Sequence, residues 1–246
     1  MNKKLIELKT PEGICDTYIS FPEGKKNLPI VLLYMDAVGL RQRIYDMADH
    51  IAEAGYFVMA PNIFYRTKRV PIADYSILPA GFPEVIKEVI AIAHQHHVDM
   101  GKRDVQYYLD FAKAQPNVDS SKIGAVGYCM GGGLAIRAAG NYPEEFKAVA
   151  SFHAGGLCTD QETSPHRYFP KMKAEVYIGH ADHDKSMPAE QITALEEVLK
   201  HVNFKNHSIL YKDCHHGWTM KDLPAYNAAG EKKHFTDLLA LFKRNL

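Results

Sequence analysis

The residues best suited to chemistry lie at 127–133, in the stretch Gly-Tyr-Cys-Met-Gly-Gly-Gly. An apolar run at 123–126 precedes them, and small residues typical of a tightly packed helix follow at 134–139. This is the G-x-nucleophile-x-G pattern of a sharp strand-to-helix turn, with cysteine where serine is usual. The outer glycines leave room for a strained backbone. A thiol at that helix N-terminus is placed to attack a carbonyl carbon, with free N–H groups nearby to hold the oxyanion.

Glycines between a strand and a helix also occur in phosphate-binding loops, and a buried cysteine is often inert. A dinucleotide site needs G-x-G-x-x-G near the first strand, whereas this turn lies in the middle of the chain. The Lys-Ser or Lys-Thr pair of a P-loop is also missing from this stretch. The nucleophile interpretation therefore depends on an acid and then a histidine following in that order.

The acid is expected at the end of an apolar strand pattern at 174–178. Asp182 stands just beyond it, where open α/β sheets place their working residues, and we predict that it is the acid. Asp184 competes two positions on, although a loop carboxylate is often a turn former or helix cap.

The base is expected after a second strand pattern at 208–211, where His215 and His216 are adjacent. Imidazole is the usual base for a thiol nucleophile. One ring is expected to face the thiol, while the other faces solvent or caps the loop.

Together these segments resemble the dienelactone hydrolase family of the α/β-hydrolase fold. The elbow, the loop at 179–188 and the spacing of His216 to Trp218 match three family motifs in order, within a likeness that extends over nearly the whole chain. The resemblance implies that Cys129 is the nucleophile, Asp182 the orienting acid and His216 the base.

The resemblance also implies an acid after the first central strand that contacts the resting thiol. Asp36 stands there, although it is one methylene shorter than the usual glutamate, and the alternative is a solvated carboxylate at a strand end. The backbone N–H groups of Ala37 and Met130 are expected to form the oxyanion hole, since the fold draws one donor from each turn.

The substrate pocket is less well defined by the resemblance. Family members that take dienelactone hold its carboxylate with arginines, one of them at the position that Met220 occupies here. Arg66 and Lys221 are the candidate substitutes, and the alternative for either is a cation exposed on the surface. We therefore expect the pocket to include Tyr65, Arg66, Trp218 and Met220.

The expected activity is hydrolysis of activated carboxylic esters, lactones or thioesters, of the carboxymethylenebutenolidase type, through a thioester acyl-enzyme and without metal or cofactor. Two alternatives remain open. One is a metal-dependent hydrolase that uses the histidine-rich segments at 94–97 and 180–184, which lack HExxH or HxHxDH spacing. The other is a catalytically silent binding module on the same scaffold, which is disfavoured because all three triad residue types are present.

Composition narrows the class of protein further. Lys plus Arg (29) balances Asp plus Glu (29) in 246 residues, so neither a nucleic acid nor an anionic membrane is an expected partner. The first residues lack the apolar core of a signal peptide, and four well-separated cysteines fit reduced thiols. We expect one domain over 1–246, cytoplasmic, monomeric or weakly homodimeric, that acts on a small molecule.

The pattern of the chain predicts an α/β fold with a mostly parallel central sheet flanked by helices on both faces. Strands are expected at 5–8, 14–19, 29–34, 56–60, 123–126, 149–152, 174–178 and 208–211. Helices are expected at 41–54, 103–114, 132–139, 189–201 and 231–242. The least regular segment, 67–102, includes a helical pattern at 84–97 and is expected to border or cover the site.

Overall fold

The computed structural model describes residues 1–93, 95 and 98–246, and contains one eight-stranded sheet. Its order is β1-β2-β4-β3-β5-β6-β7-β8, in which β1 and β2 run antiparallel to their neighbours and all other pairs are parallel. The strands are β1 (Asn2–Thr10), β2 (Gly13–Phe21), β3 (Leu28–Tyr34), β4 (Phe57–Pro61), β5 (Val118–Tyr128), β6 (Phe146–Phe152), β7 (Glu175–His183) and β8 (Asn206–His215). The predicted α/β class with a mostly parallel sheet is confirmed.

The central strands form because their side chains are apolar on both faces. In β3 every residue from Ile30 to Tyr34 is buried, and in β4 all five residues are buried. Continuous apolar runs of this kind are typical of parallel strands covered by helices on both sides. The edge strand β1 is mostly exposed, which is consistent with its place at the end of the sheet.

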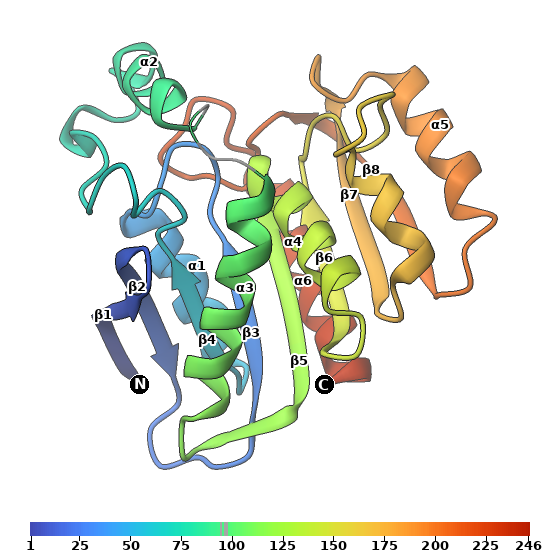
Figure 1. Cartoon of the computed structure of the whole chain (residues 1–246). Coiled ribbons are helices and arrows are strands. Elements are labelled where there is room, and N and C mark those ends of the chain that lie inside the picture. The colour runs from blue at the N-terminus through green and yellow to red at the C-terminus, as the bar shows by residue number, and fades with distance from the viewer. Residues whose placement is uncertain (94, 96–97) are drawn as a thin grey trace.

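Helices cover both faces of the sheet, as predicted (Figure 1). On one face, α3 (Val98–Lys113) and α4 (Met130–Asn141) pack against each other and against β5. On the other, α1 (Gln42–Glu53) and α6 (Ala228–Asn245) lie together, with the His50 and Phe235 ring centroids 4.1 Å apart. The helix α5 (Ala189–Leu199) follows β7.

The irregular segment 67–102 contains a short 3₁₀ helix η1 (Tyr75–Ile77), then α2 (Phe82–Ala93) and the start of α3. A second 3₁₀ helix, η2 (Pro165–Lys171), packs on α4. In Figure 1, α2 lies at the end of the molecule where the parallel strands finish. Within the described ranges, no helix is both long and apolar enough to cross a membrane.

The strands β7 and β8 run four or more residues past the carboxyl ends that their apolar patterns predict. The strand β7 continues to His183 and β8 continues to His215, and these two residues are partners in the parallel register. Polar residues extend both strands because parallel hydrogen bonding to a neighbour stabilises the backbone whatever the side chains are. The carboxyl ends of β3, β5, β7 and β8 therefore meet at one end of the sheet.

Candidate active site

The turn between β5 and α4 places Cys129 at the carboxyl end of the sheet. Cys129 has φ 53° and ψ −122°, a backbone conformation that L-residues rarely adopt. A Cβ on Gly127 would lie only 1.9 Å from the carbonyl oxygen of Gly131, so any side chain there would collide with the first turn of α4. The turn therefore requires glycine at 127 and holds the thiol above the sheet.

The same turn packs directly against the end of β3. A Cβ on Gly131 would lie 2.4 Å from the carbonyl oxygens of both Tyr34 and Met35, so only a bare backbone permits this approach. It brings the N–H of Met130 and the loop that contains Ala37 to the same end of the sheet. Neither N–H donates a hydrogen bond to another described residue. That they form the oxyanion hole remains a prediction, which this arrangement supports.

His216 bridges the thiol and a carboxylate. Its Nε2 lies 3.0 Å from Cys129 Sγ, and its Nδ1 lies 2.7 Å from Asp184 Oδ2. The hydroxyl of Ser186 lies 3.2 Å from the same Nδ1. The structure thus brings Cys129 and His216 together, as the sequence predicts, and shows that His216 is the histidine that reaches the thiol.

The acid beside His216 is Asp184, and the prediction of Asp182 is wrong. Asp182 lies within β7, where its Oδ2 accepts a hydrogen bond from the N–H of Asp213 at 3.2 Å. Asp184 is the first residue beyond the strand, and its side chain is only 2% exposed. The N–H and hydroxyl of Ser186 both donate to Asp184 Oδ1, at 2.8 and 2.6 Å. This Asp-x-Ser turn is the sequence signal that could have identified the acid.

These contacts shift the pKa values of His216 and Asp184. Burial lowers the pKa of His216, but hydrogen bonds and charge interactions with Asp184 and Cys129 outweigh it and raise that pKa to about 10. Burial raises the pKa of Asp184, but hydrogen bonds from His216 and Ser186 outweigh it and lower that pKa to about 2. Asp184 is therefore an ionised acceptor near neutral pH, which fixes a proton on Nδ1 of His216 and directs Nε2 at the sulfur.

Asp36 does not contact the thiol, contrary to the prediction. Its two oxygens accept hydrogen bonds from Arg41 at 2.7 and 3.0 Å, and the N–H of Val38 also donates to it. Arg41 in turn donates to Asp222 at 2.6 Å. Asp36 is 3% exposed, so it is not a solvated strand-end carboxylate either. The shorter aspartate is held back by the arginine five residues later, and it orders the loop that follows β3.

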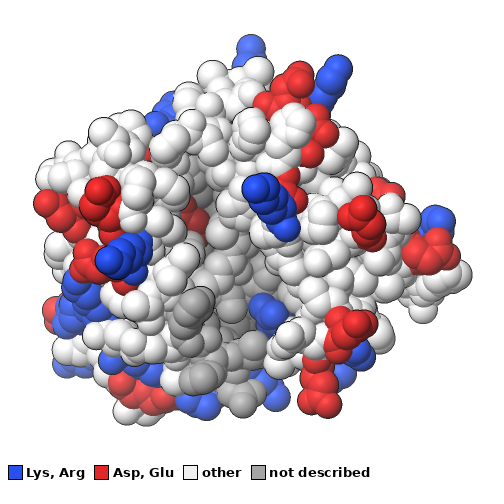
Figure 2. Space-filling view, turned by 90° about the horizontal axis from the view of Figure 1, so that it is seen from above, with Lys and Arg blue, Asp and Glu red and all other residues white. Residues whose placement is uncertain are grey.

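Two hollows meet at the thiol, and both include Cys129 and His216. We call the first the groove: it measures ≈ 760 Å³ and is bordered by Gly133, Arg137, Lys185 and Ser186. We call the second the cavity: it measures ≈ 190 Å³ and is lined by Ala37, Val38, Phe82, Ile86 and Leu223. Seen from the carboxyl end of the strands, the surface is hollowed near its centre (Figure 2). Phe82 and Ile86 belong to α2, so the segment 67–102 borders the site, as predicted.

The residues predicted for the substrate pocket line neither hollow. Arg66 is bound to Asp104 and Glu12, and the hydroxyl of Tyr65 donates to Asp104. Trp218 and Met220 are fully buried in the core. The prediction is wrong because a position counted along the chain from the catalytic histidine does not fix which way the following turn points its side chains.

His153, which no sequence motif identified, follows β6 and also lines the cavity. It has φ 42°, its Nε2 lies 2.8 Å from the hydroxyl of Thr219, and its ring centroid lies 5.5 Å from that of His216. Burial lowers its pKa well below the usual value, so the ring is neutral beside His216. The one available signal was its place directly after a parallel strand.

The metal alternative gains no support from the described residues. None of them form a group of three or more His, Cys, Asp or Glu that could hold an ion. His94, His96 and His97, which the alternative invoked, lie outside the described residues. His180, from the second histidine-rich segment, is buried and paired with the hydroxyl of Ser208.

A cysteine on a strand-to-helix elbow, backed by a histidine and an acid from later strands, defines the α/β-hydrolase class of fold and site. The sequence pattern of the dienelactone hydrolase family matches residues 15–246, and the chain belongs to that family. A relative from Synechocystis sp., named "Putative carboxymethylenebutenolidase", is 24% identical over 232 residues, which are 93% of this chain and 91% of the relative.

Solved structures show the same fold. A "Putative Dienelactone Hydrolase" from Klebsiella pneumoniae superposes with a TM-score of 0.84 at 18% identity and covers 98% of both chains. A dienelactone hydrolase-like promiscuous phosphotriesterase from metagenomic libraries superposes with a TM-score of 0.78 at 20% identity, over 99% of this chain and 98% of its own. The likeness covers the complete sheet and the helices around it, so the chain is a member of a hydrolase family with the fold expected of one.

Proposed function

We propose that the protein hydrolyses activated carboxylic esters, lactones or thioesters through a Cys129–His216–Asp184 triad and a thioester acyl-enzyme. The observation that supports this most directly is the chain of contacts at the elbow. Sγ to Nε2 measures 3.0 Å and Nδ1 to Oδ2 measures 2.7 Å, with the acid ionised and the nucleophile strained. Relatives named as carboxymethylenebutenolidases make enol-lactones of the dienelactone type the first substrates to test.

In the first half of the reaction, with the thiol proton held on Nε2 of His216, the Cys129 sulfur forms a bond to the acyl carbon as the carbonyl π bond opens, and the N–H groups of Ala37 and Met130 bind the oxyanion. The carbon–oxygen or carbon–sulfur bond to the leaving group then breaks, and His216 gives its Nε2 proton to that group. In the second half, His216 takes a proton from water, whose oxygen attacks the thioester. The carbon–sulfur bond breaks, and the acid product leaves.

The nucleophile also restricts the leaving group. A thiolate leaves a tetrahedral intermediate more readily than an alkoxide does, so an ordinary alkyl ester would tend to return to substrate. Enol-lactones, aryl esters and thioesters have leaving groups good enough to compete with Cys129. For this reason the proposal is confined to activated substrates.

The test uses 4-nitrophenyl acetate and alkylation of the thiol. Iodoacetamide should inactivate the wild-type protein by alkylating Cys129, and Cys129→Ala should abolish turnover while leaving the fold unchanged by circular dichroism. Cys158→Ala is the matched control, because Cys158 is also a free, half-buried thiol but lies outside the elbow. Normal turnover by Cys129→Ala would refute the mechanism, and loss of activity on dialysis against EDTA would instead favour a metal-dependent hydrolase.

A further inference from the structure

The groove and the cavity differ in character where they meet at Cys129. The cavity is lined mostly by apolar side chains from three separate segments: Val38, Phe82, Ile86, Leu223 and Ala225. Asp36 is paired with Arg41, and His153 is a neutral ring that pairs through Nε2 with Thr219, while its Nδ1 has no partner among the described residues. The described part of its wall therefore offers no free charge to a ligand.

The groove, in contrast, has an arginine without an acidic partner. Nε and Nη2 of Arg137 donate to the carbonyl oxygen of Thr163 at 3.0 and 2.8 Å, and no described carboxylate forms an ion pair with it. A Cβ on Gly133 would lie 3.2 Å from Nη1, so this nitrogen sits over the first turn of α4, where the groove lies.

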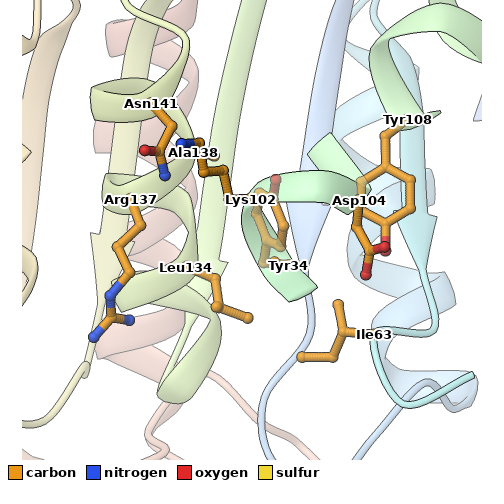
Figure 3. Close-up of a pocket in the computed structure, with 10 residues that line it drawn as sticks. Tyr34, Ile63, Lys102, Asp104, Tyr108, Leu134, Arg137, Ala138 and Asn141 are labelled. Atoms are coloured by element: carbon orange, nitrogen blue, oxygen red, sulfur yellow. The ribbon is translucent and has the colours of Figure 1, made fainter. Parts of the chain in front are cut away.

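The small pocket on the other side of Arg137 is not a competing substrate site. It lies between α3 and α4, and its volume of ≈ 10 Å³ is at the lower limit for a single water molecule. In Figure 3, Arg137 lies across the view from Asp104 and Tyr108, and Asp104 is paired with Arg66 instead. The charge of Arg137 is therefore left for the groove.

The order of the reaction steps indicates which hollow holds the acyl group of a substrate and which holds its leaving group. Once the leaving group departs, water must take its place beside His216 before the thioester can be hydrolysed. The larger groove, which is bordered by Asp184 and Ser186 on the acid side of His216, admits water directly. A leaving group in the apolar cavity would leave a space that water enters unfavourably.

We propose that the cavity binds a small, uncharged apolar acyl group and that Arg137 binds a carboxylate on the leaving group in the groove. This inference rests on the proposed function. The cavity volume of ≈ 190 Å³ limits the acyl group, since an apolar protein cavity of about 150 Å³ accommodates benzene. Acyl groups of about six to eight non-hydrogen atoms fit. A guanidinium suits a carboxylate, and the exposed Lys185 adds a second positive charge at the border of the groove.

The acyl half is tested with 4-nitrophenyl hexanoate and acetate. Wild-type protein should prefer hexanoate in kcat/KM by at least about tenfold, from burial of the extra methylenes. Ala225→Phe, which fills the cavity, should abolish that preference. Ala229→Phe, at an exposed position on α6, is the control and should keep it. A hexanoate preference that survives in Ala225→Phe would overturn the assignment of the cavity.

The leaving-group half is tested with 5-hexanoyloxy-2-nitrobenzoate against 4-nitrophenyl hexanoate. Arg137→Gln should lower the ratio of kcat/KM for the carboxylated ester to that for the neutral ester by about tenfold. Arg167→Gln is the matched control, because Arg167 also donates to backbone carbonyls but lies outside the groove. An equal ratio in wild type and Arg137→Gln would overturn the role of Arg137.

A readout without turnover separates this inference from the proposed function. The rate of Cys129 alkylation is measured by mass spectrometry. It is compared between N-hexyl-2-chloroacetamide and N-methyl-2-chloroacetamide, and between iodoacetate and iodoacetamide. Ala225→Phe should remove the preference for the hexyl reagent, and Arg137→Gln should lower the rate ratio of iodoacetate to iodoacetamide. If the alkylation preferences change as expected but the protein hydrolyses no ester, the proposed function alone is refuted. If the preferences do not change, the assignment of the acyl group to the cavity and of the carboxylate to the groove is refuted.

Discussion

Replacing the acid beside His216 tests the site most sharply, because the chain supplies its own control two residues away. Asp184→Asn removes the negative charge 2.7 Å from Nδ1 and allows the amide to donate where the carboxylate only accepts. Asp182→Asn makes the same chemical change in β7, where the carboxylate accepts a hydrogen bond from the N–H of Asp213. We expect the first substitution to be severe and the second mild.

The magnitude follows from the contact that is lost. A hydrogen bond to a charged group contributes about 1.5–3 kcal/mol, which corresponds to roughly 10- to 100-fold in rate. An amide also favours the wrong imidazole tautomer, and the comparable change in Ser-His-Asp triads costs about 10⁴-fold in kcat. For Asp184→Asn we expect kcat to fall by about 10²- to 10⁴-fold, whereas for Asp182→Asn we expect less than about threefold.

The assay is kcat for 4-nitrophenyl acetate at pH 7.5, with thermal unfolding as the check that each variant is folded. The pH dependence of Cys129 alkylation gives a second readout, because the pKa of His216 should fall once the raising effect of Asp184 is removed. If Asp184→Asn keeps kcat within threefold of wild type, or Asp182→Asn loses as much activity, the triad described here is wrong.

Three further outcomes are expected. Gly127→Ala should prevent folding or lower the free energy of unfolding by more than about 3 kcal/mol, measured in urea, because its Cβ would lie 1.9 Å from Gly131 O. Asp36→Asn should cost about 3 kcal/mol in the same assay, since it breaks a buried pair with Arg41. The pKa of His216 is raised from 6.5 to about 10, so its stabilisation is complete below about pH 6.5 and is lost as the pH rises towards 10. The stability difference between wild type and His216→Gln should therefore be smaller at pH 9.5 than at pH 6.5, and a constant difference would contradict the shift.

Features set by neighbouring residues could be predicted from the sequence. The elbow requires glycine at fixed offsets from Cys129, because a strand that turns sharply into a helix leaves no room for side chains. The parallel sheet follows from apolar runs that alternate with helical patterns. From the order of the residues, the base could be narrowed to His215 or His216, and only the structure shows which of the two reaches the thiol.

The identity of the catalytic acid and the lining of the site depended on contacts between distant segments, including the pairing that sets where each strand ends. Pairing with β8 carries β7 past Asp182, so the acid that reaches His216 is Asp184, a shift that the apolar pattern cannot show. Arg41 folds back onto Asp36 and removes it from the thiol. The apolar side chains of the cavity come from three segments that lie far apart in the sequence, so they meet only after the chain has folded. Sequence thus determined the kind of chemistry, and tertiary structure decided which acid supports it and what surrounds it.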